Sequence, residues 1–328
     1  MFDIYKINLQ LFADPNTNVT GDSGLSVENK TFYDMTLIDE AQANLVHDQF
    51  AQKRPIPKNG GKKIEFRKFA SLPKAMTPIT EGVTPDGKKL SVTAIEAEVA
   101  QYGDYIVQSD VLELTTIDNT IVEATKILGR QAGLTLDTIT RNVMQSGTNV
   151  FYAPKKDGTA VSSRSALTND CVLTVDLVER VVAFLKKNNA PKINGDYVCI
   201  LHPYCVYDLR KDPLWRAPHE YANTENIYNG ELGKISGVRF VESSEAKVYE
   251  NGVFGALFVA DGAYGVTDIT GGGLTTIIKQ KGSAGTADPL DQRSSIGWKA
   301  IKTAEILVEP YIVRVECKSA LSDDIEAN

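Results

Sequence analysis

The sequence predicts an α+β fold, because helical and extended patterns follow one another through most of its 328 residues. Apolar residues recur at spacings of three and four over 117–147, which indicates one long amphipathic helix. Polarity alternates over 62–69 and, less strictly, over 90–105, which indicates two strands. A chain that is 42% hydrophobic can bury a substantial core, and its length predicts about two domains.

The N-terminal region is predicted to be an arm. Asp, Asn, Thr, Gly and Ser dominate 13–29, and such a segment cannot offset the entropy of ordering by burying itself. We expect it to become ordered only against a neighbour. Apolar residues over 36–50 then predict a short amphipathic helix that Pro55 and Pro57 would end. Polar residues interrupt 1–13, so no signal peptide is expected, and no later run is long enough to span a membrane.

The two alternating segments are predicted to form a long hairpin. The chain between them is rich in Pro and Gly, which end strand ladders and make turns, so the tip is expected to be irregular. An isolated two-stranded ribbon is marginally stable in water. The ribbon therefore needs another surface, either in this chain or on another copy, and this predicts assembly.

The helix over 117–147 places Gly129 and Gly133 on one face. Each glycine would cost about 1 kcal/mol relative to alanine if exposed, so close packing against a partner segment is expected, with a kink between two shorter helices as the alternative. A second helix is predicted after Thr174, its N-cap, and is stopped by Pro191.

The rest of the chain alternates between strand and helix patterns. Strands are predicted at 197–201, 238–241, 254–259 and 274–279, and a short helix at 204–211. Two final strands at 298–308 and 311–317 are expected to return to the long helix.

Composition and motifs indicate no catalytic, cofactor or metal site. A net charge of −7 argues against a surface that grips phosphates. The four cysteines lack metal-binding spacing and are expected to be buried, reduced thiols of a cytoplasmic protein. His47, His202 and His219 stand alone and are expected to be packing or surface residues.

The most enzyme-like cluster is 202–215, where His202, Asp208 and Trp215 are close in sequence. No nucleophile or orienting partner accompanies them, so we interpret the cluster as a strand-to-helix junction with an aromatic anchor. An α/β enzyme using this cluster is the alternative from a different functional class, and it would require a pocket with convergent polar groups.

Three blocks carry a resemblance to a known family: 78–85 with Gln-Tyr-Gly at 101–103, His202-Pro203, and 288–299, which reads Asp-Pro-Leu-Asp-Gln-Arg and then ends in Gly-Trp-Lys. The chain resembles the major capsid proteins of tailed bacteriophages, in the group typified by the coat protein of coliphage N-four. This resemblance implies the Hong Kong 97-type capsid fold. Its parts are an N-terminal arm, an extended hairpin loop, a peripheral domain with a long spine helix, and an axial domain.

On this sequence, the resemblance implies an arm at 1–59, an extended hairpin loop at 60–105 and an axial domain at 172–285. The peripheral domain would consist of 106–171 and 286–328, with the spine helix at 117–147.

The implied function is that of a non-enzymatic major capsid protein, without a cofactor. It would self-assemble, as pentamers and hexamers, into an icosahedral shell that encloses double-stranded DNA as cargo rather than as a specific ligand. Portal and scaffolding or decoration proteins are expected partners, and a membrane is not. The expected location is the virion capsid, assembled in the host cytoplasm. An encapsulin-like nanocompartment shell is the alternative.

Two sets of residues are predicted to matter. A basic ribbon on an acidic protein is expected to face carboxylates of an adjacent subunit, so the inter-subunit candidates are Lys62, Lys63, Arg67, Lys68, Lys74 and Glu81. Trp298 is expected to be a packing anchor, and Asp291 and Arg293 are expected to fix the crossover from the axial domain to the peripheral strands. With Gly129 and Gly133, these residues are the structural candidates.

Overall fold

The computed structural model describes residues 37, 45–57, 59–69, 72–79, 81–84, 86–115, 120–215, 231–267, 272–283, 285, 288–322 and 325–328. The predicted arm before residue 45 lies outside these residues, except for Leu37, which is helical and buried. Most of the helix predicted over 36–50 also lies outside them, and 47–50 form a turn.

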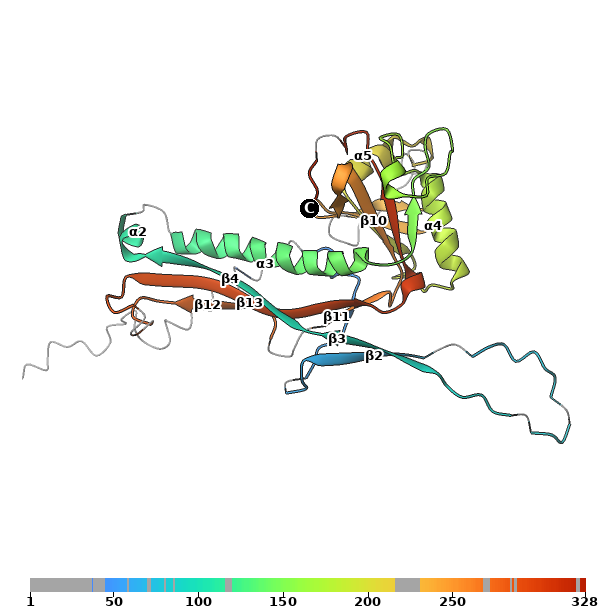
Figure 1. Cartoon of the computed structure of the whole chain (residues 1–328), viewed down its shortest axis with the longest axis horizontal. Coiled ribbons are helices and arrows are strands. Elements are labelled where there is room, and N and C mark those ends of the chain that lie inside the picture. Colours follow the sequence, from blue (N-terminus) through green and yellow to red (C-terminus); the bar gives the residue numbers. More distant parts are fainter. Residues whose placement is uncertain are drawn as a thin grey trace, which may run out of the picture.

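A long helix on a sheet forms the body of the molecule (Figure 1). Helix α3 spans Thr120–Gln145, within the range predicted for it. The sheet beneath it has the order β1-β11-β13-β12, with β4 also paired to β13. These strands are β1 (Gln52–Lys53), β4 (Ala100–Ser109), β11 (Tyr264–Thr267), β12 (Thr275–Lys279) and β13 (Arg293–Ile306). Helix α2 (Asp110–Thr115) follows β4.

The apolar stripe of α3 is buried against β13. Leu128 and Ala132 from the helix pack with Ile296, Trp298 and Ala300, which point to the same face because side chains alternate along a strand. Each fully buried large apolar side chain contributes about 1.5–3 kcal/mol relative to an exposed one. The packing of α3 on β13 therefore supplies much of the stability of the body.

A second sheet forms the core of the domain at one end of α3 (Figure 1). Its order is β5-β14-β10-β6-β8-β7, and β9 pairs with β10. Its strands are β5 (Val150–Tyr152), β6 (Tyr197–Leu201), β7 (Glu231–Ile235), β8 (Val238–Glu242), β9 (Val248–Tyr249), β10 (Val253–Val259) and β14 (Ile312–Cys317). Short 3₁₀ turns are η2 (Arg164–Ala166), η3 (Glu250–Gly252) and η5 (Glu309–Tyr311).

Both faces of this second sheet are covered. Helix α4 (Val175–Lys187) buries Leu177, Val181 and Leu185 on one face, in a cluster to which α5 (Pro203–Lys211) also contributes. The predicted N-cap of α4 is confirmed, because the backbone N–H of Leu177 donates to Oγ1 of Thr174. Met144 of α3 lies in the cluster on the other face, so the end of α3 supports the second sheet.

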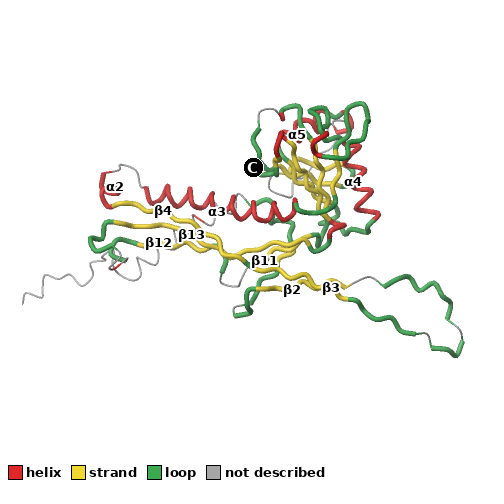
Figure 2. The backbone as a smooth tube through the Cα atoms, viewed as in Figure 1, coloured by secondary structure: helices red, strands yellow, loops and turns green. Residues whose placement is uncertain are grey.

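The ribbon is a separate two-stranded ladder. Strand β2 (Lys63–Phe69) runs antiparallel to β3 (Val92–Glu98), with Lys63 opposite Glu98. The chain between the two strands is loop wherever it is described and extends far beyond the body (Figure 2). The paired ribbon ends at Glu98, earlier than 105, because residues 100–109 form a ladder with β13 instead.

The sheets divide the chain differently from the boundaries expected at 172, 285 and 286. Strands β5 and β14 lie in the second sheet, although both were expected in the peripheral domain with the long helix. Strands β11 and β12 lie beneath α3, although both were expected in the axial domain. The reason is pairing: β14 completes an antiparallel ladder with β10, and β12 forms a hairpin with β13.

Gly103 offers a test of the ladder between β4 and β13. It lies opposite Lys299, and a Cβ atom there would stand 2.5 Å from the carbonyl oxygen of Trp298. We expect Gly103→Ala to lower the free energy of unfolding by about 1–3 kcal/mol, the usual cost of overpacking. Urea unfolding of this variant and of Gly87→Ala, where nothing lies within 4 Å, provides the measurement and its control. Equal stability of the two variants would contradict the described register.

Candidate functional site

The ribbon carries the predicted inter-subunit residues. Lys62, Lys63, Arg67, Lys74 and Glu81 are exposed. Lys68 lies opposite Thr93 in the ladder, and its side chain is outside the described part of the structure.

Two of these cations pair with carboxylates of the same ribbon. Nζ of Lys63 lies 3.4 Å from Oε2 of Glu96, and Nε of Arg67 lies 3.1 Å from Oε1 of Glu65. The hydrogen bond from Arg67 to Glu65 raises the pKa of the exposed Arg67 guanidinium. Exposed pairs of this kind contribute about 0–1 kcal/mol, so they leave the ribbon able to exchange partners.

Large apolar side chains of the ribbon loop are also exposed, and the sequence patterns did not single them out. Met76 is 81% exposed and Ile79 is 75% exposed. The others are Leu72, Val83 and Leu90. Single exposed apolar residues are ordinary, but several on one projecting loop indicate a surface that is covered by a partner.

A buried polar junction joins residues 46–48 to α3. The backbone N–H groups of Val46 and His47 donate to Oδ1 of Asp137 at 2.9 and 2.8 Å, and Nδ1 of His47 lies 2.6 Å from Oδ2 of Asp137. Both side chains are fully buried. Tyr264 of β11 donates its hydroxyl to the carbonyl of His47. His47 is therefore a buried, hydrogen-bonded residue rather than a surface residue.

The next residue joins the arm to two elements at once. Asp48 accepts a hydrogen bond from Oγ1 of Thr140 at 2.6 Å and pairs with the ammonium group of Lys302 on β13. Lys302 also donates to the carbonyl oxygen of Leu136 at 2.9 Å. In the sequence, only Asp137 indicates this junction, because it interrupts the apolar face of a helix pattern. Asp48 and Lys302 lie far from it in the chain.

The predicted structural residues on α3 and β13 are mostly buried. Gly129 and Gly133 are buried in α3. Trp298 is 3% exposed and packs against α3, and its indole N–H donates to Oε1 of Gln131 at 3.2 Å. Gln131 in turn donates to Asp104 of β4 at 2.6 Å, and this bond lowers the pKa of Asp104.

The 288–299 block makes the hairpin between β12 and β13, at the end of the body remote from the second sheet (Figure 1), so it is not a crossover between domains. Oδ2 of the buried Asp288 accepts the backbone N–H of Arg293 at 2.8 Å and lies 3.7 Å from Nε of Arg293. Asp291 is exposed and has a φ of 52°. The structure therefore joins Arg293 to Asp288, and Asp291 is a turn residue in the left-handed region.

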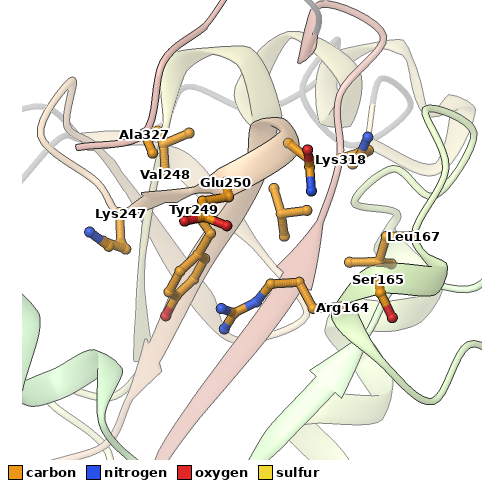
Figure 3. Close-up of a pocket in the computed structure, with 11 residues that line it drawn as sticks. Arg164, Ser165, Leu167, Lys247, Val248, Tyr249, Glu250, Lys318 and Ala327 are labelled. Atoms are coloured by element: carbon orange, nitrogen blue, oxygen red, sulfur yellow. The ribbon is translucent and has the colours of Figure 1, made fainter.

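A cavity of about 930 Å³ opens in the second domain (Figure 3). The guanidinium of Arg164 lies 3.6 Å from the ring centroid of Tyr249. Its charge is balanced by Glu316, which is fully buried and pairs with Arg164 at 2.6 Å and with Arg314 at 3.0 Å. The lining residues are Arg164, Ser165, Leu167, Lys247, Val248, Tyr249, Glu250, Asn251, Val253, Lys318 and Ala327.

The charged groups around this cavity shift one another's pKa. The hydrogen bond to Glu316 raises the pKa of Arg164. Burial, together with repulsion from Arg141 and Arg164, lowers the pKa of Lys247. The described lining includes neither histidine nor cysteine, so it offers no nucleophile with an imidazole base.

The 202–215 cluster is confirmed as a strand-to-helix junction. Nδ1 of His202 accepts the backbone N–H of Tyr204 and caps α5. The imidazole ring stacks on the ring of Phe254, with 4.9 Å between the ring centroids. Asp208 accepts the backbone N–H of Ala320 at 3.1 Å. Trp215 packs edge-on against Phe240. Each residue that suggested an enzyme therefore has a structural partner.

The remaining expectations from the sequence concern the cysteines, metal binding, membrane spans and His219. All four cysteines are buried and free, as expected. Within the described residues, no group of three or more His, Cys, Asp and Glu side chains could hold a metal ion. In the same part of the chain, no helix combines the length and the apolar character needed to cross a bilayer. His219 lies outside the described residues.

Comparison with known proteins gives a consistent result. Residues 113–273 match the model of a family described as phage capsid protein. The capsid of Ralstonia phage GP4 is similar, with a TM-score of 0.64 and 14% identity over 86% of this chain and 90% of that one. The cyanophage Pam1 capsid asymmetric unit has a TM-score of 0.65 and 13% identity, over 84% and 90%. No curated protein matches the sequence.

The holo-SrpI encapsulin complex from Synechococcus elongatus is also similar, with a TM-score of 0.56 and 9% identity over 83% of this chain and 87% of that one. The chain thus has the mixed α/β fold found in phage capsids. Together with the family match, this fold supports a major capsid protein, the structural building block of a phage head shell.

The junction between Asp48 and Lys302 generates one prediction. Lys302→Met leaves a buried carboxylate without its ammonium partner, and such a change typically costs about 3–5 kcal/mol in the free energy of unfolding. The double variant Asp48→Asn, Lys302→Met should lose less, because no uncompensated charge remains. Lys299→Met on the exposed side of β13 is the control. Denaturant unfolding of the four proteins tests this, and a double variant less stable than Lys302→Met would contradict it.

His202 generates a pH prediction. Burial lowers its pKa from 6.5 to about 4. Between these values the unfolded chain binds more protons than the native one, so the free energy of unfolding should fall as the pH is lowered from 6.5 towards 4. His202→Asn keeps a side-chain acceptor for the cap and should flatten this part of the stability profile. An unchanged profile, or an NMR titration of His202 near its ordinary pKa, would count against the assignment.

Proposed function

We propose that this chain is the subunit of an icosahedral shell of the Hong Kong 97 type, in the group typified by coliphage N-four, and that the shell encloses bacteriophage double-stranded DNA. The observation that carries the proposal is the ribbon with its exposed loop, which projects from the body and is only marginally stable alone (Figure 2). Closed lattices repeat the same contacts by symmetry, and a projecting ribbon suits contacts with the next subunit.

The partners follow from this function. The subunit associates with further copies as pentamers and hexamers, and portal and scaffolding or decoration proteins are further partners in building the head. The DNA is cargo: a net charge of −7 gives the subunit little attraction for phosphates, which favours filling and release over retention. Assembly takes place in the host cytoplasm, and the product is the virion capsid.

Charge distribution supports electrostatic contact between neighbours. Residues 60–98 carry seven basic and five acidic side chains, whereas the whole chain has a net charge of −7. The ribbon segment is therefore more positive than the rest of the chain, and complementary charges between neighbours speed correct encounters. The basic residues are Lys62, Lys63, Arg67, Lys68, Lys74, Lys88 and Lys89.

An encapsulin-like nanocompartment is the second candidate, supported by the similarity to the SrpI complex. The higher TM-scores with the GP4 and Pam1 capsids favour the phage shell. The contents of particles isolated from the producing cells distinguish the two functions, because one shell holds DNA and the other holds protein cargo.

Electron microscopy of the purified chain tests the proposed function. Closed shells or capsomers are the expected result. A chain that remains a folded monomer at high concentration would overturn the proposal.

The double variant Arg67→Glu, Lys68→Glu tests the electrostatic contact. Each lost exposed pair is worth about 0.2–1 kcal/mol, so repetition over the lattice should lower the shell yield, most strongly at low salt. Lys155→Glu, Lys156→Glu in the second domain is the control for net charge. A yield equal to that of the native chain at every salt concentration would remove this contact while leaving the shell function intact.

A further inference from the structure

The ribbon meets the body through very few side chains. Among the described side chains of β2 and β3, only Phe66 and Ala97 are buried, and Phe66 is 4% exposed. Ile64 and Ile95 share this inner face and are half-buried. Phe66 is by far the larger of the two buried residues, so its ring is the largest buried side chain among those described in the two strands.

The ring of Phe66 rests on a glycine. A Cβ atom at Gly265 of β11 would lie 3.0 Å from both Cε1 and Cζ of Phe66 and 3.3 Å from Cδ1 of Leu307. The backbone at Gly265 is not in the left-handed region. Conformational freedom therefore does not explain the glycine, but the close approach of an aromatic ring does.

The surroundings of the ring leave room on one side. A cavity of about 240 Å³ is lined by Phe66 and Ile95 of the ribbon and by Leu307 and Val308 of the body. The guanidinium of Arg54 lies 6.0 Å from the ring centroid, and the backbone N–H of Arg54 donates to the carbonyl of Val266, beside Gly265. The position of the ring is thus set mainly on the side facing β11, where Gly265 has no side chain.

We infer that the contact of the Phe66 ring with Gly265, here called the seat, fixes the direction in which the ribbon leaves the body. We also infer that Phe66 is a positioning residue for assembly. The inference rests on the proposed shell function. The chain from Phe66 to Glu81 can span at most about 50 Å, so a tilt of about 5° at the seat displaces the tip by up to about 4 Å. Such a displacement takes the exposed loop out of register with a neighbouring subunit.

Three variants test the seat. Gly265→Val fills the space occupied by the ring, Phe66→Leu shrinks the ring, and the double variant combines both changes. Gly273→Val is the matched control, because nothing lies within 4 Å of a Cβ atom there. Thermal unfolding of each soluble subunit shows whether the fold survives. Electron microscopy then measures the yield and the diameter of closed shells.

Gly265→Val should reduce the yield of closed shells of native diameter about five- to a hundredfold, the range expected for overpacking, and Gly273→Val should not. The double variant should recover most of the yield, because the smaller side chain restores the space. Native yield and diameter for Gly265→Val would overturn the inference. A double variant that folds but stays as defective as Gly265→Val would also overturn it.

A second readout does not depend on shells. The native cysteines are buried, so spin labels can be attached at Thr84→Cys on the ribbon loop and Arg180→Cys on α4, which are exposed positions. Gly265→Val should shift the distance between the labels by a few ångströms, and the double variant should reverse the shift. An unchanged distance refutes the seat even if assembly changes, whereas a native chain that forms no shells refutes only the proposed function.

Discussion

The packing of α3 on β13 is the interaction on which the other parts of the molecule depend. Strand β13 is the hub of the first sheet, since β4, β11 and β12 all pair with it. Its buried face, with Trp298 at the centre, needs the apolar stripe of α3 to exclude water. The far end of the same helix carries Met144 and Gln145 into the second domain, where Gln145 donates to the carbonyl of Gly255 on β10. One helix thus sets the positions of both sheets.

Polar contacts complete this frame where apolar packing ends. His47 and Asp48 are held by Asp137 and Lys302, and the second domain is held to α3 by Arg141, which donates to the carbonyl of Glu245 at 2.6 Å. Buried charges are costly unless they are paired, so they tolerate few alternative arrangements. Apolar packing therefore provides the stability, and these pairs specify how the segments are placed.

Local patterns in the sequence predicted the elements well and their pairing less well. The periodicity of α3, the N-cap at Thr174 and the alternation in β2 are short-range signals, and the structure contains each of them. The pairing of β14 with β10, and of β4 with β13, depends on residues far apart in the chain, which no local pattern records. The same limit explains why sequence patterns indicated the charged ribbon residues as candidates, but not Asp48, Lys302 or Gly265. The family resemblance supplied the function, since no catalytic motif competed with it.

The exposed apolar side chains of the ribbon loop also affect the fate of the subunit before assembly. A loop that presents Met76 and Ile79 to water is a substrate for proteases and a nucleus for aggregation until a neighbour covers it. Covering it requires an encounter between subunits, and the rate of encounter rises with concentration. In the proposed shell function, assembly therefore competes with proteolysis and aggregation, and a higher subunit concentration favours assembly.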